Sequence, residues 1–150
     1  GADDYFIAVK HRNHLGIMSL NPVSLDKNTT AINFTDGLLS TYGTNAQKYF
    51  STTGLYALWS GDANGDESIK FSGSNNDSNQ IRDIIINAPG NIFGSISYEY
   101  NGYFDTDTNL SASAKFSGSN NDSNLIRDIV INHPGNIFGS ISYVISAQTP

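Results

Sequence analysis

A nearly identical internal repeat constrains this fold more than any other feature of the sequence. Residues 70–98 and 115–143 align without a gap at an offset of 115 − 70 = 45 positions. The aligned residues differ only at Gln80/Leu125, Ile85/Val130 and Ala88/His133. Repeat solenoids need about three or more copies. Two copies therefore favour a pair of similar units related by a pseudo-two-fold axis.

Each copy of the repeat predicts a loop, a helix, a turn and a strand. Asn76 and Asp77 are N-cap candidates, because a short side-chain oxygen can accept the free N–H groups of a first helical turn. Apolar residues within 81–85 have helical spacing, Pro89 ends the helix, and Ile92–Tyr98 predicts a strand. The second copy repeats the pattern with Asn121, Asp122, residues 126–130, Pro134 and the strand Ile137–Tyr143. We expect the two amphipathic helices to pack together.

A spaced set of oxygen-bearing side chains lies just before each copy. The candidate ligands are Asp62, Asn64, Asp66 and Asp77 in the first loop, and Asp107, Asn109, Ser111 and Asp122 in the second. A spacing of two places successive side chains on one side of a tight loop, and the carboxylate at the helix start closes the shell. Calcium prefers such sets of six to eight oxygen ligands, so we expect two calcium sites. The second site is expected to be weaker because Ser111 replaces a carboxylate, although Asp105 is an additional candidate ligand. The alternative is that Asx-rich loops only form turns.

The first loop, Gly61-Asp62-Ala63-Asn64-Gly65-Asp66, resembles the first half of a dockerin or EF-hand-like loop. The wider sequence is similar to a C-terminal module of large secreted proteins from Bacteroidetes. The shared features are a V-K-H-R-N hairpin, a G-D-x-N-x-D loop pair, and a Gln-x-Pro ending, here Gln148-Thr149-Pro150. The resemblance implies paired calcium sites and a non-catalytic, extracellular role.

The resemblance also implies further ligands and exposes two departures. Position 7 of such a loop donates a backbone carbonyl, and an insertion of four residues within KFSGSNND can supply ligands itself. The position-7 residues are Ser68 and Ser113, and the candidate ligands from the insertion are Asn75 or Asn76, with Asn121 in the second loop. Glu67 and Ala112 stand at position 6, where these loops have glycine. The closing Asp77 falls at position 16 rather than 12.

The region before the repeats predicts a separate, strand-rich part. We expect an α+β fold with a small N-terminal β-sheet element over residues 1–52, which could form the end of a β-sandwich with strands further upstream. Its candidate strands are Tyr5–Lys10, Gly16–Leu20 and Ala31–Thr35. Residues 53–150 then form the duplicated calcium loop–helix–strand unit, with repeats at about 60–98 and 105–143.

Composition excludes several classes of function. Eight basic and 14 acidic residues give a formal net charge of −6, which argues against nucleic acid and anionic membranes as partners. There is no cysteine, no apolar run long enough for a membrane span, and no nucleophile elbow, Walker loop or H-E-x-x-H motif. Enzyme activity is therefore not expected. The cluster His11-Arg12-Asn13-His14 is interpreted as a hairpin turn, with a metal ligand or a general base as alternatives.

These observations favour a calcium-stabilised terminal module of a secreted or cell-surface protein. Its partner would be another protein or upstream domains of the same polypeptide. The alternative hypothesis is a calcium-dependent carbohydrate-binding module or adhesin that contacts a glycan through exposed tyrosines. The candidate contacts are Tyr98, Tyr100, Tyr103 and Tyr143.

Overall fold

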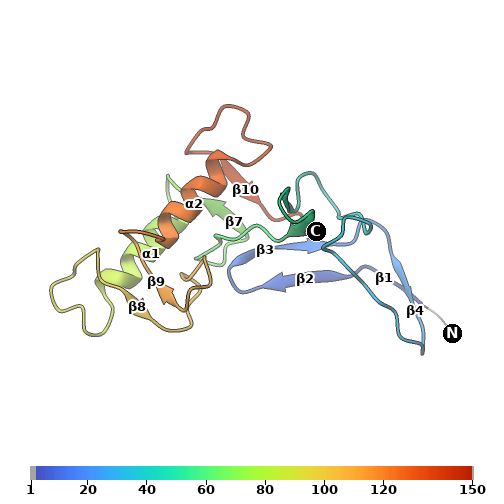
Figure 1. Cartoon of the computed structure of the whole chain (residues 1–150), viewed down its shortest axis with the longest axis horizontal. Coiled ribbons are helices and arrows are strands. Elements are labelled where there is room, and N and C mark those ends of the chain that lie inside the picture. The colour runs from blue at the N-terminus through green and yellow to red at the C-terminus, as the bar shows by residue number, and fades with distance from the viewer. Residues whose placement is uncertain (1–2, 150) are drawn as a thin grey trace. The chain divides into compact units, whose positions relative to one another are not determined.

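The computed structural model describes residues 3–149 and shows a small α+β fold, which confirms the predicted fold class (Figure 1). Gly1, Ala2 and the Pro150 of the predicted ending lie outside the described residues. Two compact units are present. The N-terminal unit comprises the chain up to His11, Gly16–Trp59 and the residues from Ala147 onward, and the repeat unit comprises Arg12–Leu15 and Ser60–Ser146. The sequence prediction placed one boundary near residue 52. In the structure the division falls after Trp59, and the short segment Arg12–Leu15 also belongs to the repeat unit.

Short paired strands make up the regular structure before residue 59. The pairs are β1 (Asp3–Tyr5) with β4 (Val23–Leu25), β2 (Ala8–His11) with β3 (His14–Met18), and β5 (Lys48–Phe50) with β6 (Leu55–Ala57). Ala31–Thr35, predicted as a strand, is irregular. The Asn33 side chain explains the difference, because its Oδ1 accepts the backbone N–H of Thr35 at 2.8 Å and so forms an Asx turn that competes with strand pairing.

Two ten-residue helices lie side by side in the repeat unit, α1 (Asp77–Ile86) and α2 (Asp122–Ile131) (Figure 1). The predicted N-caps are confirmed at one of the two candidate positions in each copy, Asn76 and Asn121, whose side chains accept the N–H of the third helical residue. The Ser78 and Ser123 hydroxyls are 2.6 Å apart. Because these residues are equivalent in the two copies, a pseudo-two-fold axis passes between them. No helix within residues 3–149 is long and apolar enough to cross a membrane.

The two copies of the repeat are intertwined through their strands. β7 (Ser68–Lys70) pairs with β10 (Val144–Ser146), and β8 (Tyr100–Asn101) pairs with β9 (Ser113–Ala114). Each strand that precedes a helix therefore pairs with the strand that follows the other helix. The fully buried aliphatic side chains of this core are Ile69, Ile81, Ile85, Ile126 and Val130.

The predicted strands Ile92–Tyr98 and Ile137–Tyr143 are wrong, because both segments are loops built from consecutive turns. The Asn91 side chain fixes the first loop. Its Nδ2 donates to the carbonyls of Ile85 and Ser95 at 2.7 and 2.9 Å, and its Oδ1 accepts the Ser95 N–H at 2.8 Å. Asn136 makes the equivalent three bonds in the second loop. These bonds occupy the backbone groups that a strand would need for a ladder.

Candidate metal-binding loops

The carboxylate of Asp62 organises the first acidic loop from inside. Its two oxygens accept the backbone N–H groups of Asp66 and Glu67 at 3.0 and 3.1 Å. Asn64 Oδ1 also accepts the Asp66 N–H, at 2.9 Å. The chain thereby turns tightly around the carboxylate, and Glu67 has a positive φ of 61°. An EF-hand loop uses glycine at this position to make the same sharp turn.

The Asp66 side chain faces outward on the same loop and forms an ion pair with Lys70. The Lys70 ammonium lies 2.8 Å from Asp66 Oδ2, and the other carboxylate oxygen accepts the N–H of Ser68 at 3.0 Å. Despite partial burial, hydrogen bonds from Lys70 and Ser68 and the Lys70 charge lower the pKa of Asp66. Asp66 is therefore ionised near neutral pH and available to a cation that displaces Lys70.

Asp77 is the closing carboxylate, and its side chain is fully buried at the first turn of α1. Its oxygens accept three backbone N–H groups, from Ala63 at 2.7 Å, Asn64 at 3.3 Å and Lys70 at 2.8 Å. Burial nevertheless raises the pKa of Asp77 to about 7, and the nearby Asp62 charge adds to the rise. Burial raises the pKa of Asp62 as well. Two buried carboxylates close together are stabilised either by protons or by a cation.

The second loop has the same construction with one carboxylate fewer. Asp107 accepts the N–H groups of Ser111 and Ala112 at 2.8 and 2.9 Å. Asp122 accepts the N–H groups of Asn109 and Lys115 at 3.1 and 2.8 Å. Burial again raises the pKa of Asp122. Ala112 has a φ of 65°, the counterpart of Glu67.

The remaining candidate ligands have other roles within these loops. Asn76 and its counterpart Asn121 serve as N-caps, and each also donates to a glycine carbonyl three residues before it at 2.6 Å. Ser68 and Ser113 are buried on β7 and β9. Asp105 is exposed, with its carboxylate 3.8 Å from the Arg12 guanidinium. The structure thus places Asp62, Asn64 and Asp66 in one loop, to whose backbone Asp77 is bonded from the start of α1, and their counterparts have the same arrangement in the second loop.

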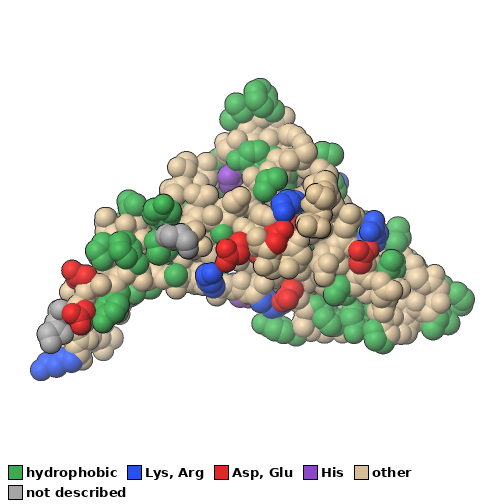
Figure 2. All heavy atoms as spheres, turned by 180° about the vertical axis from the view of Figure 1, so that it is seen from behind, with side chains coloured by type: hydrophobic (Ala, Val, Ile, Leu, Met, Phe, Trp, Pro, Cys, Tyr) green, Lys and Arg blue, Asp and Glu red, His purple; other side chains and the backbone are tan. Residues whose placement is uncertain are grey.

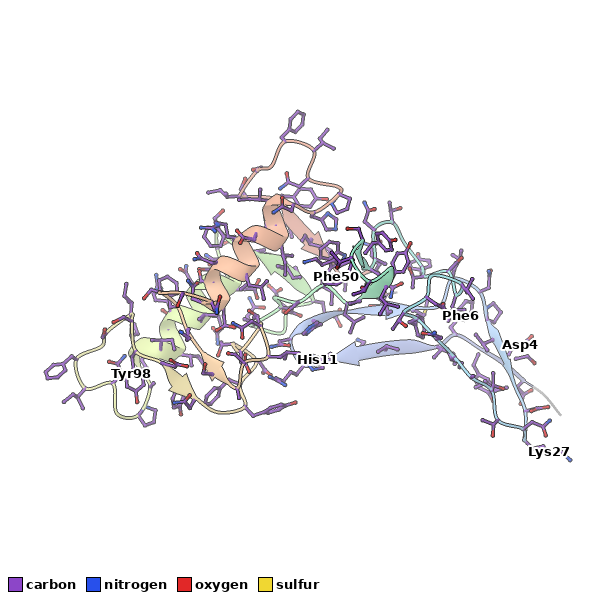
Figure 3. All side chains as sticks on the ribbon, viewed as in Figure 1. Asp4, Phe6, His11, Lys27, Phe50 and Tyr98 are labelled. Carbon is purple, nitrogen blue, oxygen red and sulfur yellow. The ribbon has the colours of Figure 1, made fainter. Side chains whose placement is uncertain are left out.

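The turn between β2 and β3 links the two acidic loops, which the sequence did not predict. The backbone carbonyl of Asn13 accepts the N–H groups of Gly61 and Asp62 at 2.9 and 3.2 Å, and its Nδ2 donates to the carbonyls of Asp105 and Asp107 at 2.8 and 2.7 Å. Asn13 is completely buried. The sequence predicted only the hairpin, which the structure confirms. Figure 3 labels His11, the last residue of β2. No spacing rule connects Asn13 with residues about 90 positions away.

Arg12 adds a positive charge to the second loop only. Its guanidinium lies 3.8 Å from Asp107 Oδ2 and donates through Nε to the Phe104 carbonyl at 3.2 Å. It also stacks over the Tyr103 ring, with its Cζ 3.6 Å from the ring centroid. The two loops therefore differ in charge balance, because in the first loop the nearest cation is the partly exposed Lys70.

The four candidate tyrosines differ widely in environment. Tyr98 is half-buried beside the loop that precedes it (Figure 3). Tyr100 stacks on Phe104 with ring centroids 4.3 Å apart, and Tyr143 stacks on the His133 ring. Tyr103 is 79% exposed.

Within the described part of the chain, the acidic side chains of the two loops do not form a tight cluster. Among residues 3–149, no three histidine or acidic side chains lie close enough together to hold a metal ion. The donor set of each loop instead mixes two or three carboxylates with amide and hydroxyl oxygens. Such a set suits a hard cation such as calcium better than zinc or copper. No protein-family model, curated protein or solved structure matches the chain.

Proposed function

We propose that this chain is a non-catalytic, calcium-stabilised interaction module of a secreted or cell-surface protein. One observation carries the proposal: the same loop occurs twice, and each time one carboxylate is buried in the loop and another at the start of the following helix, Asp62 with Asp77 and Asp107 with Asp122. Buried carboxylates that are not paired with a cation destabilise a fold. A divalent cation would remove this penalty at Asp62, Asp77 and Asp122, whereas Asp107 already has the Arg12 guanidinium 3.8 Å away.

The backbone of the loops supports calcium as the cation. Glu67 and Ala112 adopt positive φ angles at position 6, and the position-1 carboxylates accept the N–H groups of positions 5 and 6. A residue other than glycine is strained in this left-handed region. Its presence in both copies indicates that both loops keep the same sharp turn.

The charges predict unequal sites. The first loop has Asp62, Asp66 and Asp77, whereas the second has Ser111 in place of the middle carboxylate and Arg12 beside Asp107. Calcium affinity rises with the number of charged ligands. The first loop therefore binds calcium more tightly than the second.

A calcium titration by calorimetry, paired with thermal melts in calcium and in EDTA, tests the proposal. The wild-type chain should bind two ions with different affinities and melt at a lower temperature in EDTA. Asp66→Asn should weaken the tighter site, and Ser111→Asp should strengthen the weaker one. Absence of binding heat together with an unchanged melting temperature would refute calcium binding. The carboxylates would then serve only as acceptors for the backbone N–H groups of the loops.

Glycan binding is a second candidate function, favoured by the exposed Tyr103 ring beside the Arg12 guanidinium. Aromatic rings offer a flat apolar surface that can stack on a sugar. A glycan array with the wild-type chain and Tyr103→Ala, each with and without EDTA, tests this candidate. Binding that requires both Tyr103 and calcium would support it, and binding to no glycan would remove it.

A further inference from the structure

Each copy of the repeat presents two large apolar side chains to solvent at the end of a loop. Ile92 and Phe93 are 82% and 91% exposed, and Ile137 and Phe138 are 80% and 89% exposed. We call these pairs the first and second tips. Figure 2 shows apolar side chains gathered at two corners of the repeat unit. Exposed apolar surface of this kind marks an interaction site when it is ordered and repeated.

The tips are held in place rather than loosely attached. Asn91 makes the three hydrogen bonds described above behind the first tip, and Gly94 N–H closes a turn onto the Asn91 carbonyl at 3.0 Å. The Ser117 hydroxyl of the other copy donates to the Ile96 carbonyl at 3.0 Å. The second tip has the equivalent bonds, including one from Ser72. A preorganised tip loses little conformational entropy when it binds.

The surroundings of the tips exclude a strongly charged partner. Residues 88–98 and the equivalent 133–143 contain no Asp, Glu, Lys or Arg, and the histidine among them, His133, is buried. Attraction to an anionic membrane requires clustered Lys or Arg, and this chain carries a net charge of −6. The chemistry therefore points to an uncharged, concave apolar surface of a protein.

The N-terminal unit contains a surface of this kind. A hollow of about 310 Å³ is lined by the aliphatic side chains of Val23, Ala31, Ile32, Leu38 and Leu39, with Asn33 and Asp36 at its edge. The single charged group, Asp36, is satisfied within the unit, by the Asn33 amide at 2.9 Å and the Leu38 N–H at 2.9 Å. An apolar cavity of about 150 Å³ accepts a benzene ring, so this hollow has room for a phenylalanine side chain.

We propose that a tip of one copy of this chain inserts into the apolar hollow of another copy. Two otherwise unexplained apolar surfaces, one convex and one concave, then cover each other. The inference rests on the proposed interaction role but not on calcium. A tip and a hollow are different surfaces, so each copy can both insert a tip into a neighbour and receive one.

The size of the contact sets the strength of the association. Two side chains and one hollow bury less than the roughly 1,200 Å² of a stable interface. Single contacts are therefore weak, and assembly becomes appreciable where many copies are held close together. Solution experiments must consequently reach high protein concentration.

Sedimentation equilibrium between about 10 µM and about 1 mM, the range of weak contacts, tests the inference. The average mass of the wild-type chain should rise with concentration, and the double variant Phe93→Ser/Phe138→Ser should remain monomeric. Phe6→Ser removes another exposed phenylalanine ring, 56% exposed, outside both surfaces and should associate like the wild type. Leu38→Asp places a charge on the hollow at a side chain that is 88% exposed, so it should abolish association without unfolding.

Mixing the two defective variants gives the decisive result. The tip variant retains an intact hollow and Leu38→Asp retains both tips, so their mixture should form heterocomplexes that neither forms alone. A wild-type chain that stays monomeric up to about 1 mM overturns the inference. So does association that survives loss of both tips, or tip-dependent binding to phosphatidylcholine vesicles without self-association. The thermal melts in EDTA separately report failure of the calcium proposal.

Discussion

Stability in EDTA should fall as pH rises from about 4 to 7. The cause is Asp77, whose pKa rises on folding from 3.8 to about 7 because the carboxyl is buried. Between these two pH values the folded chain binds a proton that the unfolded chain has released, so stability decreases with rising pH. Asp62 and Asp122 shift in the same direction for the same reason. Above pH 7 the dependence on Asp77 ends.

The size of the effect follows from the Asp77 pKa. A rise from near 4 to about 7 corresponds to roughly 4 kcal/mol of folding free energy, at 1.36 kcal/mol for each tenfold change in proton affinity. For a chain of 150 residues, each kcal/mol moves the melting temperature by about 2–4 °C. About 3 kcal/mol of this is lost between pH 4.5 and 8, so the melting temperature in EDTA should drop by about 6–12 °C over that range.

Urea unfolding and thermal melts across this range, in EDTA and in millimolar calcium, measure the effect. Calcium should flatten or reverse the slope, because the ion replaces the proton as the partner of the carboxylate. Asp77→Asn should remove most of the slope in EDTA, and Asp122→Asn should remove a smaller part. A melting temperature in EDTA that is constant from pH 4.5 to 8 would show that the three N–H donors fully compensate the buried Asp77 charge.

Four substitutions test other parts of the structure. Asn13→Ala should cost about 2–4 kcal/mol in urea unfolding, because the buried Asp107 carbonyl and the partly buried Asp105 carbonyl lose their donor. A loss below about 1 kcal/mol would mean that water replaces the amide. Leu110, at a φ of 59° where the first loop has Gly65, is strained, so Leu110→Gly should gain about 1 kcal/mol in calorimetry. Gly65→Leu should lose a similar amount of stability, and a change of the same sign for both substitutions would contradict the argument. Asn91→Ala should reduce hydrogen-exchange protection of the Ser95 amide, while the equivalent amide in the second loop stays protected.

The helices were predictable because their signals are local. Asn76 and Asn121 accept N–H groups of the turn that follows, and this preference acts over three residues. The false strands Ile92–Tyr98 and Ile137–Tyr143 have the right apolar content, but the Asn91 and Asn136 side chains capture backbone groups inside each segment. A pattern of apolar residues does not reveal such competition, so the exposure of both tips was not foreseen.

The acidic loops were predictable only as clusters of oxygen-bearing residues. Spacing indicated that Asp62, Asn64 and Asp66 share a loop, and the structure adds that Asp77 is buried against them. Neither the burial nor the raised pKa follows from spacing. The bridging position of Asn13 depends on where a hairpin tip lies relative to residues far along the chain, and no periodicity in the sequence encodes that contact.

The pairing of strands between the two copies determines the smallest fragment that can fold. A single copy of the repeat lacks a partner for its strand, since β7 needs β10 from the end of the second copy and β9 needs β8 from the end of the first. Each acidic loop also needs Asn13, which donates to one loop and accepts from the other. A fragment that begins near residue 53 therefore leaves the Asp105 and Asp107 carbonyls without the Asn13 amide donor. Duplication has produced not two independent modules but one unit, whose two halves and hairpin tip must fold together.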